Sequence, residues 1–256
     1  MKTMPSDIKE FLEEKVFQYN TCAFIESDPI SIPHRYYLKE DIEIAGFLAA
    51  TIAWGNRTMI IKNASRLVDL MGSSPYDFIM NHDDHHLDRF KGFIHRTFND
   101  IDLVYFMKAL RNIYKNHGGL EQVFAQSLTP FSTQPSIHAF KKVFFSIEHP
   151  ARTQKHVSDP NKGSAAKKIN MFLRWMTRVD NNGVDFGIWK TVNPSQLSCP
   201  LDVHSGNVAR KLGLLKRNLN DAKAVTELDN HLRQMDATDP VKYDFALFGL
   251  GIYEKF

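Results

Sequence analysis

The most constraining feature of the chain is an apolar segment at residues 41–54, DIEIAGFLAATIAW. A helix built from this segment would be hydrophobic on nearly every side, so it would have to be buried. At a rise of 1.5 Å per residue the helix would be about 21 Å long, which is too short to cross a bilayer. We therefore expect a buried central helix that other helices surround.

Helical periodicity also dominates the rest of the chain, because apolar residues recur at intervals of three and four positions. The segments with this pattern are 5–18, 57–71, 74–80, 100–115, 119–126, 136–148, 163–178, 203–216, 220–235 and 240–250. Proline and glycine lie between the segments, where they end helices, and strand patterns are sparse. The longest irregular stretches are 128–135 and 179–200, and the second is long enough to be functional. We predict an all-α fold of about ten helices.

Two cysteines, Cys22 and Cys199, limit what sulfur chemistry can contribute. They are far apart in the sequence, and neither belongs to a Cys-x-x-Cys pair. This excludes a disulfide framework, a cysteine zinc site and a four-cysteine iron–sulfur cluster. We expect neither a metal nor another cofactor.

No segment has the features of a membrane anchor or a signal peptide. No apolar run approaches bilayer length, and the start of the chain, MKTMPSDIKEFLEEKV, is acidic and amphipathic. The hydrophobic fraction of 43% and the charged fraction of 24% are ordinary for a soluble globular protein. We expect a cytoplasmic protein with no membrane partner.

Charge is unevenly distributed, although the whole chain carries only +3. In residues 151–178 seven basic residues stand against one acid, whereas residues 202–256 balance eight basic against eight acidic residues. The basic residues of the first segment are Arg152, Lys155, Lys162, Lys167, Lys168, Arg174 and Arg178. Such a basic stripe is typical of a surface that binds a polyanion, and it is equally compatible with a solvated helix face.

Asp202 stands at the joint between an extended Pro200-Leu201 and the helical pattern of residues 203–216. An aspartate at this place is an N-cap, whose carboxylate accepts hydrogen bonds from backbone N–H groups of the first turn. Capping does not exclude chemistry, because a capping carboxylate is held ionised and oriented. The same group could stabilise a cation.

Residues 160–178, PNKGSAAKKINMFLRWMTR, combine a turn with the most basic helix of the chain. Pro160, Asn161 and Gly163 predict the turn. The apolar face of the helix consists of Ile169, Phe172, Leu173 and Met176. A different stripe holds Lys167, Asn170, Arg174 and Arg178. Taken alone, a lysine on such a stripe is a solvated surface residue.

Together these two segments resemble the helix-hairpin-helix superfamily of DNA glycosylases. The run GSAAKKIN is similar to the hairpin and catalytic-lysine helix of endonuclease III-like members, with Gly163, Lys167 and Asn170 in the matching places. The run LDVH is similar to the segment of these enzymes that contains the catalytic aspartate, with Asp202 and His204 in the matching places. An alanine before the lysine and a longer gap to the aspartate also make the chain similar to archaeal 8-oxoguanine glycosylases.

The resemblance extends to other parts of the chain. Residues 47–79 are similar to the first barrel helices of the superfamily, and the residue that fills the gap left by a flipped base would fall at Gly55 or Asn56. DPVKYDFALFGLGI, residues 239–252, resembles the superfamily's last helix. The whole chain also resembles an uncharacterised bacterial family of conserved hypothetical proteins, in DIEIAGFLAATIAWGNR, GFIHRTF, KGSAAKKINMFLRWM and PLDVHSGNVARKLGL.

The resemblance to the glycosylases implies a two-lobed helical fold with a helix-hairpin-helix element, folded as a single globular unit over residues 1–256. One lobe would be a six-helix barrel over residues 40–178 that ends in the helix-hairpin-helix. The other lobe would combine residues 1–39 with residues 179–256. The cleft between the lobes would bring Lys167 and Asp202 together.

The resemblance also implies a DNA base-excision glycosylase, with AP-lyase activity through a lysine Schiff base. Lys167 would attack the sugar C1′ of a flipped nucleotide, and Asp202 would stabilise the cationic sugar and assist proton transfer. The partner would be damaged or structured duplex DNA, bound by a monomer. Residues expected to contact DNA are Asn56, Arg57, Arg96, Arg152, His156, Lys162, Gly163, Lys168, Asn170, Arg174 and His204.

Two other functions are compatible with the sequence. The first is a catalytically silent nucleic-acid-binding protein on the same fold, whose binding would not depend on Asp202. The second is a metal-dependent hydrolase that uses the polar segment NHDDHHLD, since histidine and aspartate are common metal ligands. Its ligands would be His82, Asp83, His85 and His86.

A further segment, KGFIHRTF at residues 91–98, places His95 and Arg96 between aromatic residues. This arrangement suits a contact with a phosphate or a flipped base. It equally suits a buried pair of phenylalanines beside a surface arginine.

Overall fold

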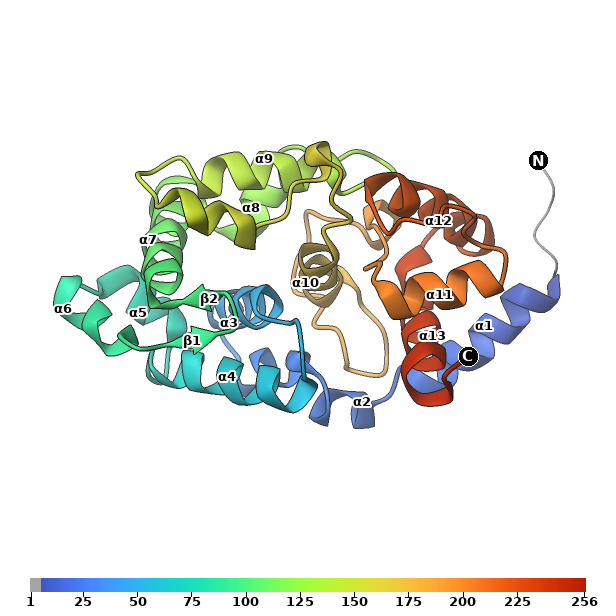
Figure 1. Ribbon diagram of the computed structural model, residues 1–256, viewed down its shortest axis with the longest axis horizontal. Coiled ribbons are helices and arrows are strands. Elements are labelled where there is room, and N and C mark those ends of the chain that lie inside the picture. The colour runs from blue at the N-terminus through green and yellow to red at the C-terminus, as the bar shows by residue number, and fades with distance from the viewer. Residues whose placement is uncertain (1–5) are drawn as a thin grey trace. The chain divides into compact units, whose positions relative to one another are not determined.

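The structure, a computed structural model, describes residues 6–256 and is mostly helical (Figure 1). The α-helices are α1 (Ser6–Tyr19), α2 (Cys22–Glu26), α3 (Lys39–Thr51), α4 (Arg57–Asp69), α5 (Pro75–Asn81), α6 (Asp84–Leu87), α7 (Asp100–Asn116), α8 (Leu120–Ala125), α9 (Gln134–Phe144), α10 (Lys167–Thr177), α11 (Val203–Lys211), α12 (Ala222–Met235) and α13 (Tyr243–Gly249). Short 3₁₀ turns span Pro29–Ser31, Pro33–Arg35, Asp88–Phe90, Ala151–His156, Pro160–Lys162, Pro194–Gln196 and Pro240–Lys242, and a π-helical turn spans Leu250–Glu254. The predicted all-α class is confirmed.

A few elements differ from the sequence-based expectation. A small antiparallel hairpin pairs β1 (Ile94–His95) with β2 (Phe98–Asn99), where no strand was expected. The polar segment at residues 81–88, which showed no helical periodicity, contains the short helix α6, because the side chain of Asp83 caps its first turn. Helix α11 ends at Lys211 and not at residue 216, since Gly213 adopts a left-handed conformation with φ 73°.

The chain divides into two compact units. Unit 1 consists of the segment up to Phe24 together with Leu128–His138 and Asp159–Phe256, and unit 2 consists of Ile25–Ser127 and Ala139–Ser158. This division differs from the predicted lobes, because residues 25–39 belong with unit 2 and α10 belongs with unit 1. The physical reason is that buried arginines of α10 pair with aspartates of the C-terminal part of the chain.

Unit 2 is built around α3. As expected for a central helix, α3 is buried from Asp41 to Thr51. Its Phe47 ring packs against three other phenylalanines, Phe106 of α7 and Phe140 and Phe144 of α9. Stacked and edge-to-face rings of this kind add specificity to ordinary hydrophobic burial. Within residues 6–256 no helix has the length and apolar character that crossing a membrane requires.

In unit 1 a hydrophobic core joins α1, α11, α12 and α13 (Figure 1). Leu12, Val208, Leu228 and Leu247 contribute one buried side chain from each of these helices. Helices α1 and α13 approach closely because residue 249 is a glycine, whose missing Cβ would lie 2.2 Å from the ring of Tyr19. This core fixes the start of α11, where Asp202 lies.

Candidate active site

The approach to α10 is a short 3₁₀ turn followed by a glycine. The 3₁₀ turn Pro160–Lys162 is capped by the Asp159 side chain, which accepts a hydrogen bond from the Asn161 N–H. Gly163 follows with φ 88°, a left-handed conformation that favours glycine. The predicted turn is therefore present, but α10 begins four residues after the expected start at 163.

Two contacts connect this turn to the start of α12. Ser164 forms a bridge with Asp221, and the Gly163 carbonyl accepts a hydrogen bond of 3.1 Å from the Ala222 N–H. Ala166 caps α10 in a left-handed conformation with φ 48°, which an alanine adopts only under strain. Its N–H donates to the Ser164 hydroxyl at 3.1 Å. The result is that Lys167 occupies the first position of the helix.

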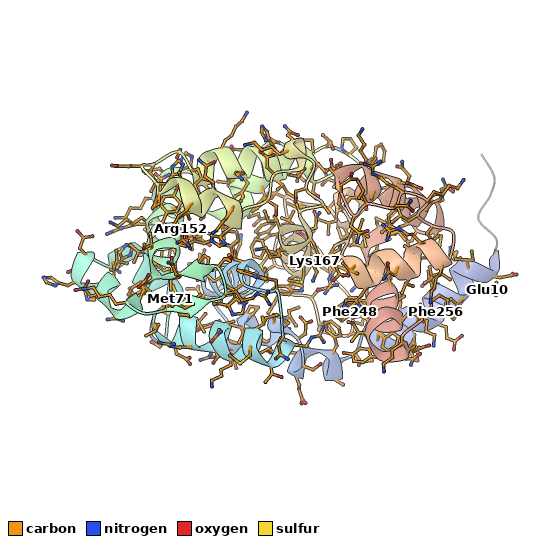
Figure 2. The ribbon with its side chains drawn as sticks, in the orientation of Figure 1. Glu10, Met71, Arg152, Lys167, Phe248 and Phe256 are labelled. Carbon is orange, nitrogen blue, oxygen red and sulfur yellow. The ribbon has the colours of Figure 1, made fainter. Side chains whose placement is uncertain are left out.

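Asp202 caps α11 and also faces Lys167. Its Oδ1 accepts hydrogen bonds from the N–H groups of His204 at 2.8 Å and Ser205 at 3.0 Å. Its Oδ2 lies 3.3 Å from the Lys167 Nζ, and the two side chains keep 28% (Lys167) and 22% (Asp202) of their surface exposed. Figure 2 shows Lys167 between the ribbons of α10 and α11. Both residues belong to unit 1, so their pairing does not depend on a cleft between lobes.

The electrostatics of this pair favour an ionised aspartate. Burial by itself would raise the pKa of Asp202, but the Lys167 ammonium and the Ser205 N–H outweigh it and lower that pKa below its usual value. The carboxylate therefore keeps its charge at neutral pH and remains available to a cation.

A second lysine, Lys168, stands at the next position of α10. Burial, together with repulsion from the adjacent Lys167 ammonium, lowers the pKa of Lys168 to about 8. The positive end of the helix macrodipole lies at this terminus and also disfavours cations. One of two neighbouring amines is thus paired with a carboxylate, and the other is partly deprotonated near pH 8.

Asp202 is also held in place by hydrogen bonds from residues that local sequence patterns did not point to. The Asn220 side-chain amide donates to the Asp202 carbonyl at 2.8 Å, and Arg210 donates to the Asn220 Oδ1. Gly206 leaves room for this arrangement, because a Cβ there would lie 2.6 Å from the Asn220 oxygen. Neither periodicity nor spacing signals an asparagine that braces a residue 18 positions earlier.

Most of the α10 stripe that was expected to be polar and solvated is buried, with Lys167 as the partly exposed member. Arg174 pairs with Asp185 and Asp244, and Arg178 pairs with Asp180, Asp185 and Asp239. Asn170 is also buried, since Thr133 donates to its Oδ1 at 2.6 Å and its Nδ2 donates to the Ala165 carbonyl at 3.1 Å. The basic count over residues 151–178 therefore overstates the positive surface, because aspartates from elsewhere in the chain neutralise its arginines.

The other residues expected to contact DNA lie at different places. In unit 1, Lys162 and His204 are exposed. In unit 2, Asn56 caps α4, Arg57 lies 3.8 Å from Asp28, and Arg96 is exposed at the tip of the β1–β2 hairpin. Arg152 and His156 both reach the buried carboxylate of Asp102. The structure thus brings together Lys167, Lys168 and Asp202 in one unit, and Arg96 and Arg152 near one hairpin in the other.

In the segment proposed as a metal site, the histidine and aspartate side chains form hydrogen bonds with nearby backbone groups. Asp83 accepts a hydrogen bond from the His86 N–H, and the His86 ring accepts one from the Asp83 N–H. His82 is buried, with its Nδ1 3.1 Å from the Phe78 carbonyl. Across residues 6–256 no group of three or more His, Cys, Asp or Glu side chains is placed to hold a metal ion. This geometry removes the support for the metal-dependent hydrolase.

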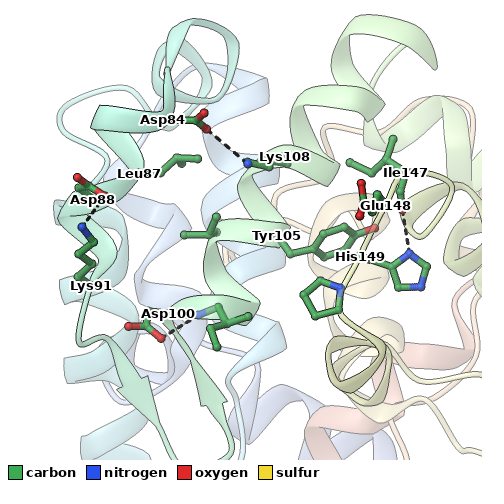
Figure 3. Close-up of a pocket in the computed structure, with 13 residues that line it drawn as sticks. Asp84, Leu87, Asp88, Lys91, Asp100, Tyr105, Lys108, Ile147, Glu148 and His149 are labelled. Atoms are coloured by element: carbon green, nitrogen blue, oxygen red, sulfur yellow. Dashed lines mark hydrogen bonds and ion pairs between the residues drawn. The ribbon is translucent and has the colours of Figure 1, made fainter.

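A large open groove of about 1040 Å³ lies elsewhere in unit 2 (Figure 3). Its apolar wall includes Ile101 and Val104 of α7. Lys108 lies 3.4 Å from Asp84, and Lys91 lies 2.9 Å from Asp88, so its lysines are paired with its own aspartates. None of the residues predicted for the site lines this groove, and its charges do not favour an anion.

Comparison with known proteins gives a family but no activity. A family model described as "Protein of unknown function (DUF2400)" matches residues 28–253. The chain belongs to the DUF2400 family. No curated protein and no solved structure matched it. The matched part of this DUF2400 protein includes both Lys167 and Asp202, so the site described above lies within the family's shared region.

Proposed function

We propose that this DUF2400 protein is a DNA base-excision glycosylase with AP-lyase activity, on a glycosylase-like fold with a helix-hairpin-helix element. The observation that carries the proposal is the distance of 3.3 Å between the Lys167 Nζ and the Asp202 Oδ2. These residues are far apart in sequence, and each stands at the start of its own helix. The same two residue types at these two places define the resemblance to the glycosylases.

The proposed reaction begins when the damaged nucleotide leaves the stack, because the sugar C1′ is inaccessible within a duplex. The Lys167 amine, once it has lost a proton, forms a bond to C1′ while the bond from C1′ to the base breaks. The base leaves with the bonding electrons and takes up a proton. The sugar ring then opens to an imine between Lys167 and C1′, and loss of the 2′ proton expels the 3′ phosphate and cleaves the strand.

Asp202 has two tasks in this scheme. Its charge stabilises the positive character that develops on the sugar as the base departs. It also lies close enough to Lys167 to accept the proton that the ammonium must lose. The hydrogen bonds from His204 and Ser205 hold the carboxylate in place, so little reorganisation accompanies the reaction.

Reductive trapping tests this proposal directly. Borohydride converts the imine to a stable amine, so protein and oligonucleotide become covalently joined. The oligonucleotides would carry 8-oxoguanine, uracil, an oxidised pyrimidine or an abasic site. We expect a trapped adduct with wild type, none with Lys167→Gln, and a strongly reduced rate with Asp202→Asn, which keeps the N-cap because asparagine caps as well as aspartate.

Two matched variants complete the test. Lys223→Gln removes an exposed lysine of unit 1 that is not among the residues expected to contact DNA, and it should leave trapping intact. Asp202→Ala removes both the cap and the charge, so a comparison with Asp202→Asn separates loss of the helix cap from loss of chemistry. If no oligonucleotide gives an adduct or base release while DNA is still bound, the protein is the catalytically silent binding protein. An adduct that persists in Lys167→Gln would contradict the assignment of the nucleophile.

A further inference from the structure

The β1–β2 hairpin of unit 2 has a strained residue at its tip. Ile94 pairs with Asn99 and His95 with Phe98, so the connecting turn consists of Arg96 and Thr97 alone. Arg96 adopts φ 55°, and it is one of three non-glycine residues with positive φ in the described chain. Two-residue hairpin turns prefer glycine or asparagine at such a position. An arginine occupies a position where glycine would remove the strain, which points to a use for its side chain.

A second loop is shaped around the same side chain. Gly55, between α3 and α4, has φ 107°, and a Cβ on it would lie 2.8 Å from the Arg96 Nη1 and 3.3 Å from its Cδ. Gly55 thus leaves room for the Arg96 guanidinium in its present position, which a Cβ would displace. Two separate backbone segments therefore adopt unusual conformations around one arginine.

The base of the hairpin is rigid, so the tip is held in position. His95 is 3% exposed, its Nε2 lies 3.2 Å from the Trp54 carbonyl, and its Nδ1 lies 2.9 Å from the Asn63 amide. Phe98 is fully buried and packs edge-to-face on the His156 ring. This placement matches the second interpretation of the sequence, because the two phenylalanines are buried and Arg96 lies at the surface.

A second guanidinium is fixed beside the turn. Arg152 donates to the Thr97 carbonyl at 3.0 Å and pairs with the Asp102 Oδ2 at 2.7 Å. The Asp102 carboxylate is completely buried and also accepts from the Thr153 hydroxyl at 2.7 Å. The Arg152 side chain nevertheless keeps 37% of its surface exposed. Arg96 forms no ion pair within residues 6–256, so the hairpin tip carries net positive charge.

We propose that Arg96 and Arg152 together bind a phosphate group of a nucleic-acid backbone. Guanidinium groups present paired N–H donors that match phosphate oxygens, and two of them held near one turn would form a preorganised site. The phosphate chemistry follows from these residues, and the choice of nucleic acid as its source rests on the proposed function. This site belongs to unit 2, whereas Lys167 and Asp202 belong to unit 1, and it would bind the strand without taking part in the reaction.

The test uses Arg96→Gly in the full-length protein. Glycine suits the turn, so we expect the thermal midpoint of unfolding to stay the same or rise. Affinity for an undamaged duplex, measured by fluorescence anisotropy across a series of salt concentrations, should fall. The slope of log K against log salt should become less steep by about 0.9, the change expected when one phosphate contact is lost.

Two further variants sharpen this test. Arg96→Lys keeps the charge, so it should retain most of the salt slope while losing affinity through the lost paired geometry. Arg89→Ala removes another exposed arginine of unit 2, whose guanidinium donates to the Leu70 carbonyl, and should leave both affinity and slope unchanged. Unchanged affinity and slope in Arg96→Gly would overturn the phosphate site, and so would a slope that falls equally in Arg89→Ala.

The outcomes for this site and for the proposed reaction can be told apart. If Arg96→Gly binds DNA as wild type does while wild type forms the trapped adduct, only the phosphate site is wrong. If binding falls in Arg96→Gly but wild type forms no adduct, only the reaction is wrong. Binding of inorganic phosphate or of phosphatidylglycerol vesicles without any binding of DNA would assign the two arginines to another phosphate source and overturn the nucleic-acid site.

Discussion

The two ends of α10 carry the same kinds of charged group in very different surroundings. At the start of the helix, Lys167 faces Asp202 with about a quarter of each side chain exposed. Towards its end, Arg174 and Arg178 are almost fully buried among several aspartates. The first arrangement leaves a cation and an anion within reach of a ligand. The second arrangement surrounds its arginines with aspartates and leaves no room for a ligand.

The comparison teaches that the number of charges in a helix does not identify the reactive ones. Buried ion pairs keep their partners because an unpaired charge in the interior costs several kcal/mol. A partly exposed pair is held more weakly, so a substrate can replace water or one partner without disrupting the fold. Arg174 and Arg178 therefore belong to the stability of unit 1, and Lys167 and Asp202 to its proposed chemistry.

The largest expected effect is on stability, at the buried end of the helix. Arg174→Ala leaves Asp185 and Asp244 buried without their main cation and should lower the free energy of unfolding by about 3–5 kcal/mol. Lys167→Gln is the matched control and should lower it by less than about 1 kcal/mol, because its pair is partly solvated. Urea denaturation of both variants measures the difference. An equal loss of unfolding free energy in the two variants would mean that the ion pairs at the two ends of α10 contribute equally to stability.

A smaller effect should appear in the pH dependence of stability. Burial raises the pKa of Asp229 to about 6, against the opposing influence of the Cys199 N–H and Arg233. Because the folded pKa lies above the unfolded one, the folded state binds this proton more tightly. Its contribution is complete below about pH 4 and is lost as pH rises through about 6.

Asp229→Asn tests this linkage, since asparagine cannot titrate. The loss of stability between pH 4 and pH 7 should become smaller by about 2 kcal/mol relative to wild type. Asp221→Asn serves as the control, because the hydrogen bond from the Arg217 side chain lowers the pKa of Asp221 to about 2, below the range from pH 4 to pH 7. A wild-type stability that is flat between pH 4 and pH 7, or unaffected by Asp229→Asn, would contradict the assignment.

The smallest effect concerns reactivity and not stability. Because the pKa of Lys168 is lowered to about 8, acetic anhydride should acetylate it with a midpoint near pH 8. In Lys167→Gln the neighbouring ammonium is gone, so this midpoint should move upward. Peptide mass spectrometry after brief labelling at several pH values measures it, with the exposed Lys162 as internal reference. Identical midpoints for Lys162 and Lys168 would show that the start of α10 does not perturb its amines.

Some of the site could be predicted from local sequence, because it depends on local interactions. A capping aspartate needs only the N–H groups that follow it, so the pattern around Asp202 predicted the cap that the structure contains. The burial of α3 follows from a run of apolar residues that no solvated face could accommodate. The glycine turn at Gly163 is likewise a property of a few neighbouring residues.

Other features could not be predicted, because they depend on residues distant in the chain. Arg174 lies 70 positions from Asp244, and nothing in the periodicity of α10 distinguishes a buried arginine from a solvated one. The hairpin at Arg96 is too short to produce a strand pattern, and its strain became visible only with the backbone angles. The boundary between the units also depends on these distant contacts, which placed α10 with the C-terminal helices.

The sequence by itself determined the helical class, the buried α3, the cap at Asp202 and the candidate pair of lysine and aspartate. Only the tertiary structure decided that Lys167 and Asp202 lie 3.3 Å apart, and that Arg174 and Arg178 are neutralised. The physical reason is the range of the interactions. Helix formation and capping act over a few residues, whereas the exposure and pairing of a charge are set by whichever distant groups the fold packs against it.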